Sequence, residues 1–103
     1  MGTTIAEEMI GTRVLVRTRN AGVFAGVMVA CQGQCVKLSA ARRLWHWEGA
    51  ASLSELAVRG TCNPGGCKFP AAVRKALLYG WIELLECTDE GWASIMSVPE
   101  WRA

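Results

Sequence analysis

Cysteine is the only residue type in this chain whose spacing suggests a metal site. Four of the five cysteines form two close pairs, Cys31 with Cys35 and Cys62 with Cys67. Four thiolates brought together would hold a structural zinc ion. However, three and four residues separate the paired cysteines, where zinc knuckles usually have two, and a hairpin turn would point Cys31 and Cys35 apart. We therefore expect free thiols and no cofactor, with a structural zinc site at Cys31, Cys35, Cys62 and Cys67 as the alternative.

The other chemistry-bearing residues do not form a catalytic set. A nucleophile would need a histidine beside a serine or cysteine. The one histidine, His46, lies between two tryptophans in an alternating stretch, where it faces away from both. Asp89 and Glu90 open an expected helix, and Glu83 and Glu86 lie at an odd spacing that puts them on opposite faces of a strand. The sequence predicts a binding protein rather than an enzyme.

Tryptophan and arginine provide the strongest binding signal. In the alternating segment 42–47, Arg43, Trp45 and Trp47 share one face and Arg42 lies on the other. An arginine beside an indole can stack a base and neutralise a phosphate. The same pair can anchor a protein interface or fill a core, and these three interpretations stay open.

Basic residues are concentrated in the same half of the chain. Residues 11–47 contain no acid and include Arg13, Arg17, Arg19, Lys37, Arg42 and Arg43. This asymmetry indicates either an anion-binding surface or a solvated strand face. If a ligand or partner surface is present, we expect it to be formed by Arg17, Arg19, Arg42, Arg43, Trp45 and Trp47.

Composition limits the class of protein. The 103 residues suffice for one domain, spanning 1–103, and the apolar content of 51% with only 19% charged residues favours self-association. A net charge of +2 does not by itself imply nucleic acid. Glu7 and Glu8 argue against a secretory signal, no stretch has the length of a membrane span, and an odd cysteine number favours a reducing compartment. We expect a cytoplasmic protein that does not bind membranes.

Periodicity predicts a mostly β protein. Residues 12–19 alternate as a strand, 20–22 form a turn, 23–30 form a second strand bent at Gly26, and 35–38 form a short third strand. Residues 42–47 are extended, and a capping-box pattern predicts a helix over 52–59. After a loop over 60–72, residues 76–86 suit a central, bent strand, and Thr88 starts a second helix that Pro99 ends. The predicted fold class is α+β, mostly β, with a small, strongly bent antiparallel sheet and two short helices.

Several linked motifs resemble a known family. They are Ala21-Gly22-Val23-Phe24-Ala25-Gly26, Ala41-Arg42-Arg43-Leu44-Trp45, Trp47, Gly49-Ala50-Ala51-Ser52-Leu53 and Gly60-Thr61. Together they are similar to a family of small phage and prophage proteins of unknown function. The resemblance implies a phage or prophage origin and transfers no residue role.

A second resemblance concerns shape. A strand, a glycine-containing turn, a longer strand bent at a glycine and a short third strand, over residues 12–38, are similar to the opening of Sm-like small barrels. That family closes bent five-stranded sheets and assembles into rings. The resemblance implies an SH3/Sm-like barrel as the alternative to an open bent sheet, and it is used for shape only, since fold does not imply function.

Two functional expectations follow. The first is a non-enzymatic phage or prophage accessory protein in the bacterial cytoplasm, assembled as a homo-oligomer, that antagonises a host defence system by sequestering a nucleotide signal or capping a host protein. The alternative is an Sm-like protein that binds RNA or single-stranded nucleic acid. For this alternative, the affinity for nucleic acid should fall steeply as the salt concentration rises.

Overall fold

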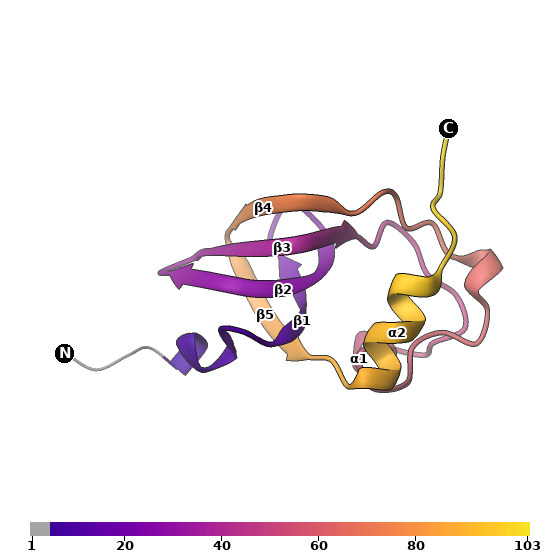
Figure 1. The fold of residues 1–103 in the computed structure, drawn as a ribbon, viewed down its shortest axis with the longest axis horizontal. Helices are drawn as coiled ribbons and strands as arrows, with labels where there is room; N and C mark the ends of the chain where they lie inside the picture. The colour runs from indigo at the N-terminus through magenta and orange to yellow at the C-terminus, as the bar shows by residue number, and fades with distance from the viewer. Residues whose placement is uncertain (1–4) are drawn as a thin grey trace.

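The computed structural model describes residues 5–103, which form one five-stranded antiparallel sheet with two short helices at one end (Figure 1). The strand order is β4-β3-β2-β1-β5. The elements in chain order are η1 (Ile5–Met9), β1 (Arg13–Thr18), β2 (Val23–Gln32), β3 (Cys35–Arg43), α1 (Leu53–Arg59), η2 (Pro64–Gly66), β4 (Val73–Tyr79), β5 (Trp81–Glu86) and α2 (Asp89–Ser97), where η marks a 3-10 helix. The α+β, mostly β prediction is confirmed, and of its two forms the open sheet is observed.

The β1–β2 hairpin follows the sequence prediction. Its turn is closed by Thr18, whose Oγ1 accepts from the Ala21 N–H and donates to the Gly22 carbonyl, each at 2.8 Å. Gly22 has φ +89°, a conformation that side chains disfavour. The predicted irregularity at Gly26 is also present, because the β2–β3 register shifts there and a Cβ would lie 3.0 Å from the Leu38 side chain.

The third strand is longer than predicted. We expected it to end at Leu38 before a break at residues 39–41, but β3 continues to Arg43. Ala40 takes φ +49°, and this irregularity opposite Gly26 lets pairing resume at Arg42. Beyond Arg43 the extended segment is no longer part of the sheet, and His46 forms an isolated bridge with Lys68.

The predicted central strand over 76–86 is wrong. Gly80, at φ +75°, divides it into β4 and β5, which become the two outer strands of the sheet. β4 pairs with β3 and β5 pairs with β1. Within residues 5–103, β4 and β5 do not pair with each other, so the sheet stays open. The apolar density of the segment arises because Leu78 and Leu84 pack on one side of the sheet and Leu85 packs on the other.

Both faces of the central strand β1 are covered. Val14 and Val16 belong to an apolar cluster enclosed by the bent sheet, with Phe24, Met28, Val36, Leu38, Ala41 and Leu78. Leu15 points the other way into a cluster that the helices complete, with Leu56, Phe69 and Ile95. Alternate side chains of β1 therefore pack into two different apolar clusters, one on each face of the sheet.

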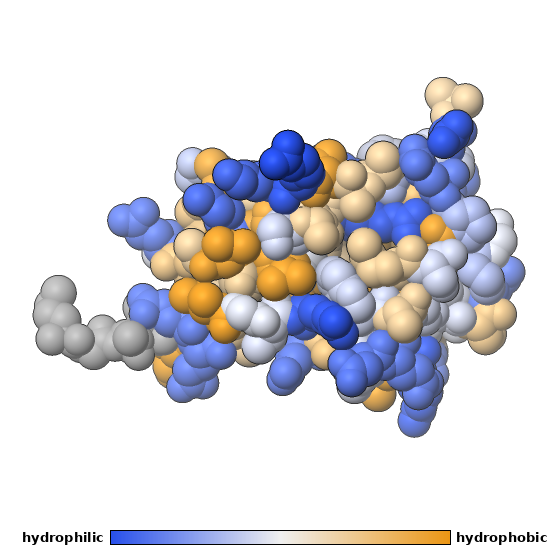
Figure 2. All heavy atoms as spheres, in the orientation of Figure 1, coloured by the Kyte–Doolittle hydropathy of each residue, from blue (hydrophilic) through white to orange (hydrophobic). Residues whose placement is uncertain are grey.

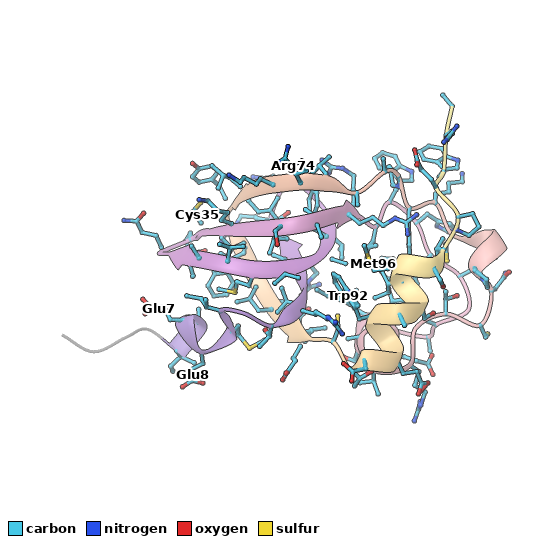
Figure 3. The ribbon with its side chains drawn as sticks, in the orientation of Figure 1. Glu7, Glu8, Cys35, Arg74, Trp92 and Met96 are labelled. Carbon is cyan, nitrogen blue, oxygen red and sulfur yellow. The ribbon has the colours of Figure 1, made fainter. Side chains whose placement is uncertain are left out.

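The helices begin at the predicted caps and pack closely together. Ser52 caps α1 by accepting from the Glu55 N–H at 3.1 Å, and Thr88 caps α2 by accepting from the Gly91 N–H at 2.9 Å. A Cβ on Gly91 would lie 2.0 Å from the Ala57 carbonyl oxygen, so glycine permits this approach. Trp92 and Met96 of α2 face the sheet and pack on the helix-side core (Figure 3). Among the described helices, none has the length and apolar character needed to cross a bilayer.

Arg42 links β3 to the helical end of the molecule. Its side chain is buried, with 4% exposure. Nε donates to the Pro70 carbonyl, Nη2 to those of Phe69 and Val98, and Nη1 to those of Ile95 and Met96, over 2.7–3.4 Å. Burial lowers the pKa of this guanidinium, which nevertheless stays charged at any ordinary pH. Arg42 was expected on a binding surface, and the structure instead places it in the interior.

We expect Arg42→Met to lower the free energy of unfolding by about 3 kcal/mol or more, because five carbonyls lose a charged donor. Urea unfolding followed by tryptophan fluorescence measures the change. Arg102→Met is the matched control, since the Arg102 side chain is 78% exposed, and it should change the free energy of unfolding by less than about 0.5 kcal/mol. Equal stability of the two variants would contradict the role of Arg42.

Cys87 makes stability fall at alkaline pH. Burial, and next the Glu86 carboxylate, raise the pKa of this thiol from 9.0 to about 11. Between these values the unfolded chain releases a proton that the folded chain retains, so stability is intact below pH 9 and declines as the pH rises toward 11. Urea unfolding from pH 8 to 10.5 should show a steeper decline for the wild type than for Cys87→Ala. Cys62→Ala, which removes an exposed thiol, should keep the wild-type slope.

Candidate functional site

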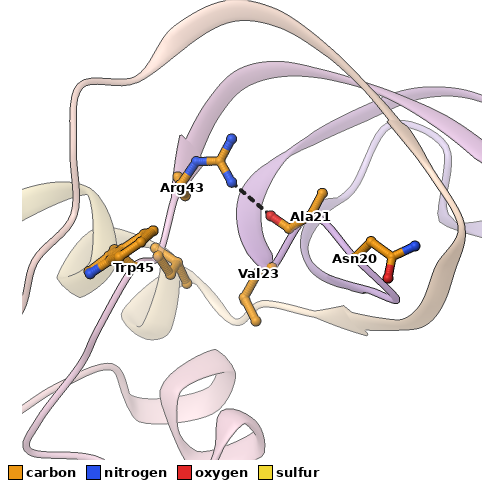
Figure 4. A pocket seen from close by; sticks show the side chains of 7 residues that line it. Asn20, Ala21, Val23, Arg43 and Trp45 are labelled. Carbon is orange, nitrogen blue, oxygen red and sulfur yellow. Dashed lines mark hydrogen bonds between the residues drawn. The ribbon is translucent and has the colours of Figure 1, made fainter.

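A groove opens between the β1–β2 turn and the end of β3 (Figure 4). Its volume is about 450 Å³, within the usual range for small-molecule sites. We call it the Arg43 groove, and it is lined by Asn20, Ala21, Gly22, Val23, Arg43, Leu44 and Trp45. Two segments far apart in the sequence meet here because β2 pairs with β3, which places Phe24 opposite Arg43.

Arg43 is held in place although it is exposed. Its Nη1 donates to the Ala21 carbonyl at 2.7 Å (Figure 4). Its Cζ lies 4.4 Å from the centre of the Phe24 ring, a cation–π distance. The described contacts use one of the several N–H donors of the guanidinium, so the group can still bind an anion.

Trp45 supplies an aromatic surface beside Arg43. Its side chain is 65% exposed, while its backbone is fixed by hydrogen bonds from the Leu44 N–H to the Val23 carbonyl, at 2.8 Å, and from its own N–H to the Lys68 carbonyl, at 3.1 Å. Leu44 between them is buried. An ordered backbone with an uncovered indole suits stacking of a flat ring.

The structure brings together only part of the predicted surface. Arg43 and Trp45 share the groove, as their alternation predicts. Trp47 leaves that face and packs on the helix-side core. Arg17 pairs with Glu83 at 3.3 Å on the neighbouring strand, and Arg19 is exposed beyond the groove lining.

Sequence reasoning missed the turn residues Asn20, Ala21 and Gly22 as part of the site. They carry no reactive group, so residue type alone does not mark them. The available signal was the hairpin itself, since a turn before β2 lies near the end of a third strand that pairs with β2.

The structure does not bring together the four cysteines of the alternative zinc site. Cys31 pairs with Val36, and Cys35 with Gln32, so the side chains of Cys31 and Cys35 belong to opposite faces of the hairpin. Cys35 lies at the far end of the sheet from η2, beside which Cys62 and Cys67 lie (Figures 1 and 3). Within residues 5–103 no group of three or more histidine, cysteine or acidic side chains could hold a metal ion.

His46 belongs to a polar network in a loop region. Its Nε2 lies 3.2 Å from Oε2 of Glu48, whose Oε1 accepts from Asn63 Nδ2 at 3.2 Å. Thr61 donates to the Glu48 carbonyl, and the Cys67 thiol lies 3.6 Å from the same oxygen. These bonds join residues 46–48 to the 61–67 loop.

Comparison with known proteins places the chain in a family. Residues 11–95 match the family model described as Domain of unknown function (DUF6948). No match was found among curated proteins or among solved structures. Because the match runs from the start of β1 into α2 and includes the whole sheet and both segments of the Arg43 groove, the protein belongs to the DUF6948 family.

Proposed function

We propose that the protein is a non-enzymatic binding protein that holds a nucleotide-type ligand in the Arg43 groove. One observation carries the proposal: the exposed Trp45 indole lies in the same groove as a guanidinium held by Ala21 and Phe24. The indole would stack on the base and Arg43 would bind the phosphate. Stacking of a base on an aromatic side chain contributes about 1–3 kcal/mol.

The lining of the groove supports binding without catalysis. Asn20 and Arg43 are its polar side chains, and the other lining residues are apolar or glycine. Asn20 offers an amide for the edge of a base, and Arg43 offers charge. General acid–base or nucleophilic chemistry would need a carboxylate, imidazole, thiol or hydroxyl in reach of the ligand, and the described lining has none of these groups.

The biological role that fits this chemistry is sequestration. A phage or prophage protein in the bacterial cytoplasm that binds a nucleotide signal tightly would remove it from a host defence pathway. The motif resemblance supports the phage origin, and the groove supports the ligand class. Capping of a host protein through the same tryptophan and arginine is the competing outcome of the tests below.

An Sm-like nucleic-acid binder is less well supported by the geometry. Arg13 pairs with Asp89 at 3.1 Å, Arg17 pairs with Glu83, and Arg42 is buried. These contacts neutralise or hide half of the basic residues in the acid-free segment. A compact ligand at Arg43 needs fewer free cations than a strand of phosphates.

Self-association is the second part of the proposal, and the open edges of the sheet support it. β4 carries Arg74 and Lys75, whereas β5 carries Glu83 and Glu86. Apolar side chains also stay exposed on these strands, with Tyr79 at 70% and Ile82 at 46%, and apolar surface is visible over the sheet in Figure 2. Pairing of β4 of one copy with β5 of another would cover both edges and match their charges.

Trp45→Ala should weaken nucleotide binding about tenfold or more, because the stacking surface is lost. Isothermal titration calorimetry with adenosine, guanosine, cytidine and uridine 5′-monophosphates measures the affinity. Trp101→Ala removes an indole that is also exposed, at 44%, outside the groove, and it should bind like the wild type. Equal affinity of the two variants, or a wild type that binds neither these four nucleotides nor a dinucleotide made from them, would sink the proposal.

Charge reversal should control assembly. Native mass spectrometry of the wild type should show an oligomer, while Arg74→Glu/Lys75→Glu and Glu86→Lys should each shift it toward monomer. Mixing these two variants should restore association, because opposite charges again face each other. A monomeric wild type at about 50 μM, or reversal variants that assemble fully on their own, would contradict pairing through these edges.

A further inference from the structure

A second groove meets the Arg43 groove at Arg43. Its volume is about 400 Å³. We call it the β4 groove, and besides Arg43 it is lined by Phe24, Ala41, Pro70, Ala71, Val73, Ala76, Leu77 and Leu78. Among the described residues, Arg43 is the one that lines both grooves, so its guanidinium lies between two grooves of similar volume.

The position of Arg43 between the hollows is structurally defined. The Ala21 carbonyl holds Nη1 at 2.7 Å, on the side of the Arg43 groove. The Phe24 ring, which lines the β4 groove, lies 4.4 Å from Cζ. An anionic group bound to this guanidinium would therefore have a hollow on each side.

The two hollows differ in chemistry. The Arg43 groove offers an indole and an amide, from Trp45 and Asn20. Apart from Arg43, the β4 groove is lined by apolar side chains, and its wall includes Val73 at 49% and Leu77 at 54% exposure. A flat, weakly polar ring would cover this apolar wall, whereas a phosphate or a sugar alone would leave the apolar side chains exposed to water.

We propose that the ligand is a dinucleotide-type molecule, with two planar bases joined by a phosphate linkage. This inference rests on the proposed function, since it takes the Arg43 groove as the site of one base. One base stacks on Trp45, the linking phosphate binds Arg43, and the second base occupies the β4 groove. The site thereby discriminates by ligand length, because a mononucleotide fills one hollow and leaves the other empty.

The test compares two probes, adenosine 5′-monophosphate and the linear dinucleotide pApA, by isothermal titration calorimetry. The measured quantity is the ratio of their affinities. The wild type should prefer pApA at least tenfold. Ala71→Trp, which fills the β4 groove from an exposed position, should bring the ratio close to one. The neighbouring Ala72 is exposed and does not line the β4 groove, so Ala72→Trp should keep the wild-type ratio.

Leu77→Ser provides a second variant, since it removes part of the apolar wall without filling the groove, and it should also lower the ratio. A wild type that binds both probes with equal affinity, or an unchanged ratio in both Ala71→Trp and Leu77→Ser, would overturn the second subsite and leave the proposed function standing. A wild type that binds neither probe would overturn both.

Discussion

The interaction between the Arg42 guanidinium and five backbone carbonyls determines how the rest of the molecule is arranged. The carbonyls come from the segment before β4 and from the C-terminal end of α2, where unpaired helix carbonyls carry partial negative charge. A single side chain thus donates to all five carbonyls, although the Phe69 carbonyl also accepts from the Trp101 N–H and the Ile95 carbonyl from the Val98 N–H. Because side chains alternate along an extended chain, burial of Arg42 also turns Arg43 outward and prepares the groove.

The adjacent arginines show how strongly context decides the role of a residue. Arg42 and Arg43 are neighbours on the same strand and have the same side chain. Arg42 is buried and connects the sheet to the helical end, whereas Arg43 is exposed and lines both grooves. Elsewhere in the basic half, Arg13 and Arg17 lie beside carboxylates contributed by α2 and β5. The charge asymmetry of the sequence is therefore partly cancelled in space, because two of its six basic residues pair with carboxylates.

Features with local causes were predictable from the sequence. β1, the turn before β2, the irregularity at Gly26 and both helix starts follow from alternation, glycine and capping residues within a few positions. Burial of Arg42 was not predictable in this way, since its acceptors lie at residues 69–98 and leave no local pattern. For the same reason Trp47, which alternation places beside Trp45, turns instead toward a core supplied by distant helices. Within the site, alternation paired Arg43 with Trp45, but the wall formed by residues 20–23 required knowledge of strand pairing.

Gly80 has a consequence for how the sheet comes apart. Gly80 is the single residue between the two outer strands. Loss of strand pairing at one edge of the sheet can therefore spread to the other edge through this residue. The β1–β3 meander is built from neighbouring segments, whereas β5 must return to β1 from the far end of the sheet. Because β5 joins β1 across a long stretch of sequence, we expect this pairing to form after the β1–β3 meander, and loss of β4 and β5 together would expose both edges of that meander.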